Sequence, residues 1–295
     1  MKGVRNLNYE ITGHTRLTGL LGHPVSHSIS PMMHNASFQR LGLDYVYLCF
    51  DITEKDLHTA VEGLKLLNVR GFNCTMPDKT KMCELVDQLS PAARMIGAVN
   101  TVVNDNGVLT GHNTDGIGYI QALAENNFSI KGKSMTLLGA GGAATAVCVQ
   151  AALDGAKSIY LFNRKGSSWN HAQELADRIT RDTSCHVELF DLADESSLKS
   201  ALDVSDLLTN TTPVGMCPNE NLSPLPSKKL LHESLLVSDI IYNPRETLLM
   251  RQAKEQGCKT FNGLYMLLYQ GAEAFRIWTG QAMPVDFIKN TYFSN

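Results

Sequence analysis

Alternation of short apolar runs with longer helical patterns constrains the fold of this chain most. The apolar runs include "LTGLLG" from residue 17, "YVYLCF" from 45, "GFNCT" from 71 and "AVNTVV" from 98. Between them, "TEKDLHTAVEGLKLLN" begins at a potential cap, Thr53, and places Leu57, Val61, Leu64 and Leu67 on one helical stripe. This alternation is typical of a parallel or mostly parallel sheet covered by helices. The sequence therefore predicts an α/β protein.

Two domains are expected, because the pattern becomes more regular in the second half of the chain. After the turn signal "NDNG", a helix is predicted to begin near Asp115, and strands follow at "SMTLLG", "SIYLFN", "SDLLTN", "LLVSDIIY" and "CKTFNG". We expect an N-terminal α/β substrate domain formed by residues 1–115 and 263–295. Residues 116–262 are expected to form a Rossmann-type doubly wound dinucleotide-binding domain. The last helix, "GLYMLLYQGAEAFRIWTG", has no other obvious core to join than the first domain.

Composition and charge narrow the class of partner. The 295 residues carry a formal net charge of -3, with 43% hydrophobic and 19% charged residues, so there is no broad basic field to attract nucleic acid or an anionic membrane. A small molecule is the expected partner. No secretion signal or membrane-spanning stretch is apparent, which favours a cytoplasmic location. The seven cysteines are scattered without zinc spacing, so no metal site is expected.

The segment "LLGAGGAATA" places Gly139, Gly141 and Ala144 on a G-x-G-x-x-A spacing after a predicted strand and before a predicted helix. Glycines permit a tight turn and let the backbone approach a pyrophosphate at the amino terminus of the helix. The same spacing also occurs in turns that bind nothing. The surrounding order of strand, loop, helix and strand favours the dinucleotide site.

The end of the next strand bears on the choice of cofactor. A carboxylate at this position would accept the ribose 2′-hydroxyl of NAD, but the chain has "FNRKGSS" and no acid. Arg164 and Lys165 could pair with the 2′-phosphate of NADP, whereas Asn163 could hydrogen-bond either ribose. The alternative interpretation is a solvated basic loop.

Polar residues at predicted strand ends in the first domain suggest acid–base chemistry. Lys79 of "GFNCTMPDKTK" follows Pro77, which suits the first turn of a helix, and Asn100, Asn113 and Asp115 lie near other strand ends. A lysine with the ordinary pKa of about 10.4 is a poor base at neutral pH, but a neighbouring carboxylate can orient and stabilise its ammonium form. A catalytic Lys79/Asp115 pair and a structural salt bridge both fit this pattern.

The motifs together resemble the shikimate dehydrogenase family over nearly the whole chain. They are "GHPVSHSISPMMHN", "NCTMPDK", "GAVNTV", "HNTDGIG", "LLGAGGAA", "FNRK", "YNP" and "NGLYMLLYQGAEAF", in that family's order and spacing. The chain looks most similar to the quinate/shikimate dehydrogenase branch. The resemblance implies NAD(P)-dependent interconversion of shikimate and 3-dehydroshikimate in aromatic amino-acid synthesis, and of quinate and 3-dehydroquinate as a second reaction.

Carried over by position, the resemblance also implies site residues. The catalytic pair would be Lys79 and Asp115. The substrate contacts would be Ser28, Ser30, Thr75, Asn100, Tyr242 and Gln270. The cofactor contacts would be Gly139, Ala140, Gly141, Gly142, Ala143, Asn163, Arg164, Lys165, Thr209 and Gly263.

The chain departs from the family pattern in two places. Lys165, Gly166 and Ser167 match neither the basic pattern of NADP-specific members nor the acid that often favours NAD. We therefore expect use of both NAD and NADP, with NAD accepted. Asp78 replaces the aromatic residue or asparagine that usually precedes the lysine, and it either lowers the local potential or faces solvent.

The stretch "HSISP" predicts a carboxylate site at the start of a helix. Pro31 suits the first helical position, with Ser30 as its cap. In an extended lead-in, Ser28 and Ser30 would project to one side and Ile29 to the other, towards the core. Two hydroxyls would then lie side by side.

Two rival functions remain open. One is a dehydrogenase of the same plan that acts on another polyol acid. The other is a non-catalytic sensor of quinate or shikimate, which loss of Lys79 or Asp115 would mark, and both residues are present. The sequence leaves the choice between a monomer and a homodimer open.

Overall fold

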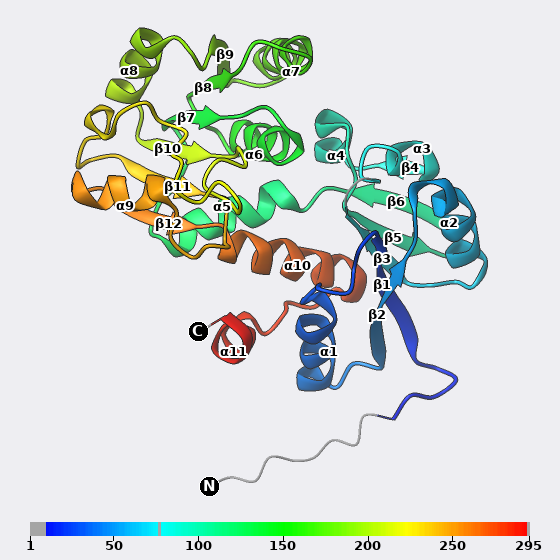
Figure 1. The fold of residues 1–295 in the computed structure, drawn as a ribbon. Coiled ribbons are helices and arrows are strands. Elements are labelled where there is room, and N and C mark those ends of the chain that lie inside the picture. Colours follow the sequence, from blue (N-terminus) through cyan, green and yellow to red (C-terminus); the bar gives the residue numbers. More distant parts are fainter. Residues whose placement is uncertain (1–9, 76–77, 294–295) are drawn as a thin grey trace, which may run out of the picture. The chain divides into compact units, whose positions relative to one another are not determined.

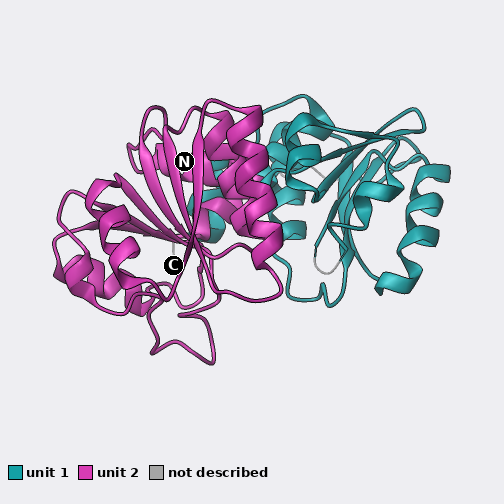
Figure 2. Cartoon of the chain, turned by 90° about the horizontal axis from the view of Figure 1, so that it is seen from above, with its two compact units in different colours: residues 1–114, 271–295 teal, residues 115–270 magenta. Residues whose placement is uncertain are grey.

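The computed structural model describes residues 10–75 and 78–293 (Figure 1). They form two compact units, coloured separately in Figure 2. Unit 1 comprises residues 1–114 and 271–295, and unit 2 comprises residues 115–270. The expected return to the first domain at residue 263 coincides with the approach to helix α10 (Leu264–Thr279), whereas the division between the units falls within that helix. No helix in the described part of the chain is long and apolar enough to cross a bilayer.

Unit 1 is built on a mixed sheet with the strand order β2-β1-β3-β5-β6-β4. Strand β5 runs antiparallel to both of its neighbours, and the other adjacent pairs are parallel. In chain order the elements are β1 (Arg16–Gly22), α1 (Ser30–Leu41), β2 (Tyr45–Asp51), η1 (Glu54–Asp56), α2 (Leu57–Leu66), β3 (Gly71–Cys74), α3 (Met82–Leu85), β4 (Gln88–Leu89), α4 (Pro91–Ile96), β5 (Thr101–Asp105) and β6 (Val108–His112), with α11 (Val285–Ile288) and η3 (Lys289–Phe293) after the return.

The direction of β5 matters for the site. Because β5 is antiparallel to β3 and β6, its first residue lies beside the ends of those strands, with Asn73 paired to Thr101 and Thr101 to His112. The predicted strand "AVNTVV" thus begins only at Thr101. Strand β6 is not predicted by the sequence, since its residues alternate weakly between apolar and polar. The hairpin turn between the two strands uses Asn106 and Gly107, both with positive φ, as the "NDNG" signal predicts.

The apolar stripe predicted for helix α2 is confirmed except at its last position. Leu57, Val61 and Leu64 are buried in the core of unit 1, as the stripe predicts. Leu67 is 72% exposed, so its predicted place on the stripe is wrong, because the helix ends at Leu66. Thr53 precedes the short helix η1 instead of α2, and its hydroxyl donates to Asp56 at 2.8 Å.

Unit 2 is a doubly wound parallel sheet, and the predicted fold class is confirmed. Its order is β12-β11-β10-β7-β8-β9, so the chain starts in the middle, moves outward through β8 and β9 and then crosses to β10. The elements are α5 (Asp115–Glu125), β7 (Ser134–Leu138), α6 (Gly142–Leu153), β8 (Ser158–Asn163), α7 (Trp169–Asp182), β9 (His186–Asp191), α8 (Glu195–Val204), β10 (Leu207–Asn210), η2 (Lys228–Leu230), β11 (Leu236–Asp239), α9 (Leu248–Glu255), β12 (Lys259–Asn262) and the first part of α10.

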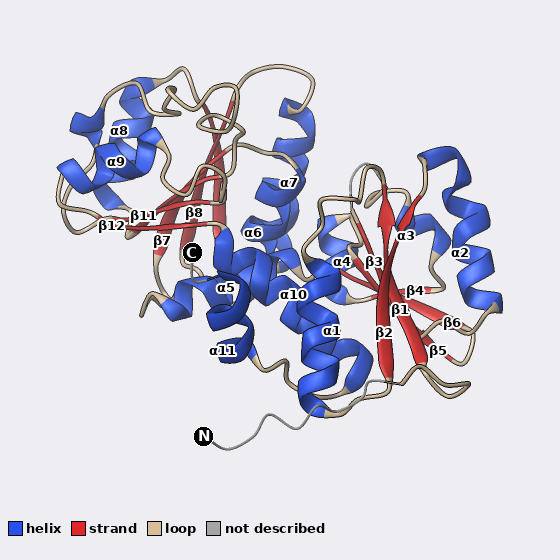
Figure 3. Ribbon diagram, turned by 60° about the horizontal axis from the view of Figure 1, so that its bottom comes forward, coloured by secondary structure: helices blue, strands red, loops and turns tan. Residues whose placement is uncertain are grey.

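Helices cover both faces of this sheet (Figure 3). Helices α6 and α7 lie on one face, and α8 and α9 pack together on the other through a core that includes Leu198, Leu202 and Leu249. The strand order reverses between β7 and β10, and ligands of open α/β sheets bind beyond the carboxyl ends of the strands at such a point. A ligand of unit 2 is therefore expected at the loops that follow β7 and β10.

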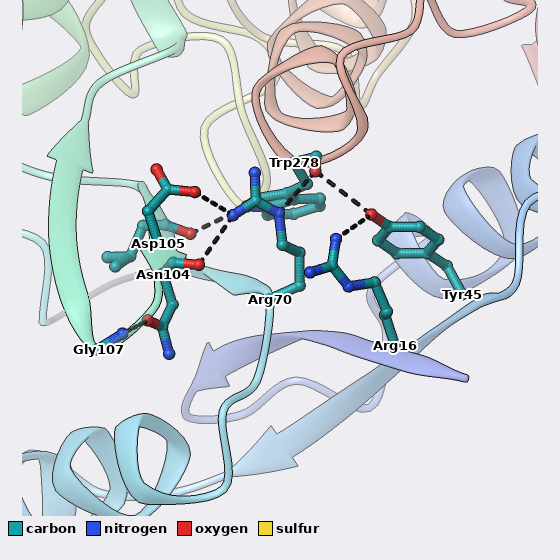
Figure 4. Close-up of polar contacts among 8 residues, drawn as sticks. Arg16, Tyr45, Arg70, Asn104, Asp105, Gly107 and Trp278 are labelled. Carbon is teal, nitrogen blue, oxygen red and sulfur yellow. Dashed lines mark hydrogen bonds and ion pairs between the residues drawn. The ribbon is translucent and has the colours of Figure 1, made fainter. Parts of the chain in front are cut away.

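The end of helix α10 is anchored in the core of unit 1 (Figure 4). Trp278 is buried, and its indole Nε1 donates to the carbonyl of Val102 at 2.9 Å. Arg70 donates from Nε to the carbonyl of Trp278 at 2.8 Å and from Nη1 to that of Asn104 at 2.8 Å, and it pairs with Asp105. These contacts tie the returning segment to β3 and β5.

Candidate active site

The structure corrects the prediction at the start of helix α1. The helix begins at Ser30, and Ile29 before it already has helical φ and ψ of −86° and −7°. The predicted extended lead-in is therefore wrong, Ser30 is not the cap, and Ile29 is partly exposed instead of turned into the core. The hydroxyl of Ser28 accepts a hydrogen bond from the Ser30 amide at 3.2 Å, so it stands at the amino terminus of the helix.

A buried polar network leads from Tyr47 across the sheet of unit 1. The Tyr47 phenol donates to Asn73 Oδ1 at 2.8 Å. Asn73 Nδ2 donates in turn to the Asn100 carbonyl at 3.1 Å and to Thr101 Oγ1 at 3.0 Å. Burial raises the pKa of Tyr47 well above its usual value, so the phenol remains a donor.

Both the oxygen and the nitrogen of the Asn100 side-chain amide are hydrogen-bonded to Thr114. Its Oδ1 accepts from the Thr114 amide at 2.9 Å, and its Nδ2 donates to Thr114 Oγ1 at 3.1 Å. Thr114 directly precedes Asp115, the first residue of α5. The orientation of Asn100 is thus fixed by the segment that leads into the predicted catalytic aspartate.

Lys79 lies in a turn before α3, and not in the helix that Pro77 predicts to begin near it. Pro77 itself lies outside the described residues. The carbonyl of Lys79 accepts from the Val99 amide at 2.8 Å, which holds the turn beside Asn100. The Thr75 amide donates to the Leu21 carbonyl at 3.0 Å, so the chain leaving β3 stays close to the end of β1.

Asp78, directly before Lys79, is fully buried, so the expectation that it faces solvent is wrong. Burial and the nearby carboxylate of Glu54 raise the pKa of Asp78. Its side-chain oxygens have no hydrogen-bond partner within residues 10–75 and 78–293.

The glycine loop of unit 2 follows β7. Gly139 has φ of +101°, a conformation that favours glycine, and its amide donates to the Phe162 carbonyl at 2.8 Å. Ala140 is buried, Ala143 is half-buried, and Gly141 and Gly142 are exposed with open space where a Cβ would stand. The open amides at the start of α6 fit the pyrophosphate of a dinucleotide.

The loop after β10 packs against the glycine loop. Thr211 donates from its amide to the Leu138 carbonyl at 2.9 Å, and a Cβ at Gly139 would lie 3.0 Å from Thr211 Oγ1. Thr209, the predicted cofactor contact, is instead fully buried and hydrogen-bonded to the Tyr119 phenol at 2.5 Å. Thr211 and Thr212 are the threonines that directly follow β10, beside the glycine loop. A prediction that strand β10 ends at Asn210 would have pointed to these two threonines instead of Thr209.

The loop after β8 carries two basic residues and lies beside an acid of the neighbouring strand β9. Asn163 is buried and donates from Nδ2 to Ser168 Oγ at 3.0 Å, and Arg164 is exposed. Lys165 Nζ lies 3.6 Å from a carboxylate oxygen of Asp191, which ends the neighbouring strand β9. Asp191 was not among the predicted residues, because it ends the next strand along the chain.

The remaining predicted residues lie near β12 and α10. Tyr242 is 47% exposed in the loop after β11. Gly263 donates to the Ile241 carbonyl at 3.1 Å, and a Cβ there would collide with the Ile240 backbone. Gln270 Nε2 donates to the Leu267 carbonyl at 3.0 Å within α10.

The predicted set is divided between the two units. The unit 1 members are Ser28, Ser30, Thr75, Lys79 and Asn100, and the unit 2 members are Asp115, Tyr242, Gln270 and all the predicted cofactor contacts. Among the described residues, no group of three or more His, Cys, Asp or Glu side chains is placed to hold a metal ion.

An α/β unit with a buried polar network and a doubly wound unit with an open glycine loop are typical of two-domain proteins that bind a dinucleotide. The family description "Shikimate dehydrogenase substrate binding domain" matches residues 20–102, and "Shikimate 5'-dehydrogenase C-terminal domain" matches residues 263–291. The chain is 53% identical over 290 residues to the shikimate dehydrogenase (NADP(+)) of Listeria innocua, covering 98% of this chain and 100% of that protein. The chain belongs to the shikimate dehydrogenase family, which confirms the predicted resemblance.

Solved structures agree over the full fold. Shikimate 5-dehydrogenase from Listeria monocytogenes, in complex with shikimate and NAD, matches with a TM-score of 0.93 and 53% identity, over 95% of this chain and 97% of that one. Quinate dehydrogenase from Corynebacterium glutamicum, in complex with NAD, matches with a TM-score of 0.84 and 31% identity, over 95% and 99% of the two chains.

Proposed function

We propose that the protein interconverts shikimate and 3-dehydroshikimate with a nicotinamide cofactor. The observation that carries this proposal is the hydrogen-bonded network from Tyr47 through Asn73 to Asn100, which orients polar groups at one edge of the unit 1 sheet. A ring that bears a carboxylate and several hydroxyls requires such a set of fixed donors and acceptors. The 53% identity to a shikimate dehydrogenase supports the same substrate.

Ser28 and Ser30 would bind the substrate carboxylate, since both hydroxyls lie at the amino terminus of the 12-residue helix α1, where the helix dipole favours negative charge. Thr75, Asn100, Tyr242 and Gln270 would contact the remainder of the substrate. Asn100 suits a ring hydroxyl, because its orientation is already set by Thr114.

Lys79 would accept the proton of the 3-hydroxyl during oxidation and return it during reduction. Asp115 would stabilise the ammonium form of Lys79 and so favour its role as proton acceptor. A bound nicotinamide supplies the acceptor for the hydride that leaves the same carbon. The 3-hydroxyl loses one proton to Lys79, its carbon loses one hydride, and a carbonyl remains.

Both NADP and NAD are proposed as cofactors. Exposed Arg164 would pair with a 2′-phosphate, whereas Lys165 is already partly neutralised by Asp191. The relatives support both choices, since one is named for NADP(+) and two solved structures hold NAD.

Quinate is a second candidate substrate, favoured by the similarity to a quinate dehydrogenase. The test is the near-ultraviolet absorbance of reduced nicotinamide with purified protein and either shikimate or quinate, each with NAD and NADP. We expect turnover of shikimate with both cofactors. No change in absorbance in any of the four mixtures would reject the proposal. Shikimate binding without turnover would favour a non-catalytic sensor.

A further inference from the structure

A carboxylate is buried at the end of β11, outside the residues assigned above. Asp239 is 1% exposed. Its Oδ1 accepts hydrogen bonds from the Ile241 amide and from Asn210 Nδ2, both at 3.1 Å, and its Oδ2 accepts from Thr247 Oγ1 at 2.8 Å. Ile241 and Thr247 belong to the loop of residues 240–247, which we call the β11 loop.

Asn210 extends this arrangement to a second loop. Its Oδ1 accepts from the amide of Thr212 at 3.0 Å and from Thr212 Oγ1 at 2.7 Å, while its Nδ2 also donates to the Val214 carbonyl at 3.2 Å. Residues 211–215, the β10 loop, are therefore tied through Asn210 to Asp239. The pair joins the β10 loop to the β11 loop beyond the carboxyl ends of adjacent parallel strands.

The two loops flank the predicted cofactor contacts. Thr211 of the β10 loop packs on Gly139, and the β11 loop contains Tyr242 and receives the Gly263 amide at the Ile241 carbonyl. A displacement of either loop would therefore change the edge of unit 2 at which the order of its strands reverses.

A carboxylate at this buried position is costly unless its acceptor capacity is used. Burial raises the pKa of Asp239 to about 6. Its donors include an amide N–H, an asparagine and a threonine. An ionised carboxylate is an acceptor-only group, so it can receive all three donors at once. An apolar residue would suffice for packing alone.

We propose that Asp239 is a positioning residue, which fixes the β10 loop and the β11 loop in the geometry that receives the nicotinamide cofactor. The proposal rests on the proposed function only in that a nicotinamide cofactor binds to unit 2. Asp239 acts through the backbone and hydroxyl groups it holds.

The test compares Asp239→Asn, Thr247→Val and Thr247→Ser with a control, Thr136→Val. Thr136 is also fully buried in unit 2, but its hydroxyl bonds Ser205 at 2.9 Å, away from both loops. The first readout is amide hydrogen exchange of peptides covering residues 211–215 and 240–247 in protein without cofactor. The second is the Kd for NADPH and NADH, measured by fluorescence.

We expect Asp239→Asn and Thr247→Val to speed exchange in both loops and to raise the Kd for NADPH about tenfold, the effect of losing one hydrogen bond to a charged group. Thr247→Ser keeps the donor and should restore both readouts to within about twofold of wild type, and Thr136→Val should leave them unchanged even if it lowers Tm.

Unchanged exchange and cofactor affinity in Asp239→Asn and Thr247→Val, with only a lower Tm, would overturn the proposal. If Asp239→Asn does not fold, the contrast between Thr247→Val and Thr247→Ser decides. Neither readout needs a substrate. A wild-type protein that binds NADPH but does not turn over shikimate would therefore contradict the proposed function alone.

Discussion

At the scale of single residues, the site depends on which groups are held in place. Ser28, Asn100 and Lys79 are common residue types, and what distinguishes them is the backbone and side chains that fix them. The amide of Asn100 is held by Thr114, and the turn of Lys79 is held by Val99, two residues whose side-chain chemistry takes no part in the proposed reaction.

Replacing Lys79 by alanine should remove the proposed proton acceptor. We expect Lys79→Ala to lower kcat for shikimate oxidation by about 10²- to 10⁴-fold, the usual contribution of general acid–base catalysis, while the Kd for NADPH stays near the wild-type value. Lys81→Ala is the matched control, because Lys81 lies in the same turn, is exposed and forms an ion pair with Glu54 at 3.7 Å. Near-normal turnover of Lys79→Ala would contradict the assignment.

Replacing Ser28 by alanine should weaken substrate binding and spare the cofactor. The variant loses a donor to the substrate carboxylate, so the KM for shikimate should rise about tenfold while that for NADP changes little. Ser26→Ala, at an exposed position in the same loop, provides the comparison. An equal KM for shikimate in both variants would mean that Ser28 serves only the start of α1.

At the scale of elements, close packing decides where glycine is required. Strand β3 passes directly beneath Trp278 of helix α10, and a Cβ at Gly71 would overlap the Trp278 indole nitrogen and the Val102 carbonyl. Those two atoms form the hydrogen bond that anchors the end of α10. The glycine is thus needed for the approach of the helix to the strand.

Gly71→Ala should therefore destabilise unit 1. Forcing a methyl group into this contact should cost about 2 kcal/mol or more in the free energy of unfolding, measured by denaturant titration. Gly63→Ala in α2 is the control, since nothing lies within 4 Å of a Cβ there, and alanine in a helix should be neutral or stabilising. Equal stability of Gly71→Ala and wild type would show that α10 can shift without cost.

At the scale of the whole molecule, each unit has its own core, and unit 1 includes a fully buried histidine. His34 is fully buried and stacks on Tyr47 with ring centres 4.5 Å apart. Neither ring nitrogen has a hydrogen-bond partner in the described part of the chain. Burial lowers the pKa of His34 to about 3, so the folded protein keeps the ring neutral.

This histidine should make folding sensitive to acid. Its folded pKa, about 3, lies below the unfolded value of 6.5, so stability is complete above pH 6.5 and is lost as pH falls from 6.5 towards 3 while the unfolded chain takes up the proton. Between pH 7 and pH 5, His34 should contribute a loss of about 2 kcal/mol. His34→Leu should reduce the fall in unfolding free energy over this range by that amount. An unchanged pH dependence would contradict it.

Much of the fold was readable from local pattern. The positions of β1, β2, β8 and α5 follow from apolar periodicity and turn residues, which act over a few neighbouring positions. Strand β6 and the exposure of Leu67 could not be predicted from local pattern. The pairing partner of a strand and the point where a helix ends depend on contacts with distant segments.

The sequence by itself determined the α/β class, the glycine loop, the family and the residue types of the site. The tertiary structure decided which residues are buried and which distant partners they have. It placed Thr209 in the core and Thr211 beside Gly139, set Asp191 beside Lys165, and joined Asp239 to Asn210. The physical reason is that these relations are hydrogen bonds, ion pairs and packing between separate strands, whose alignment exists only once the sheet has formed.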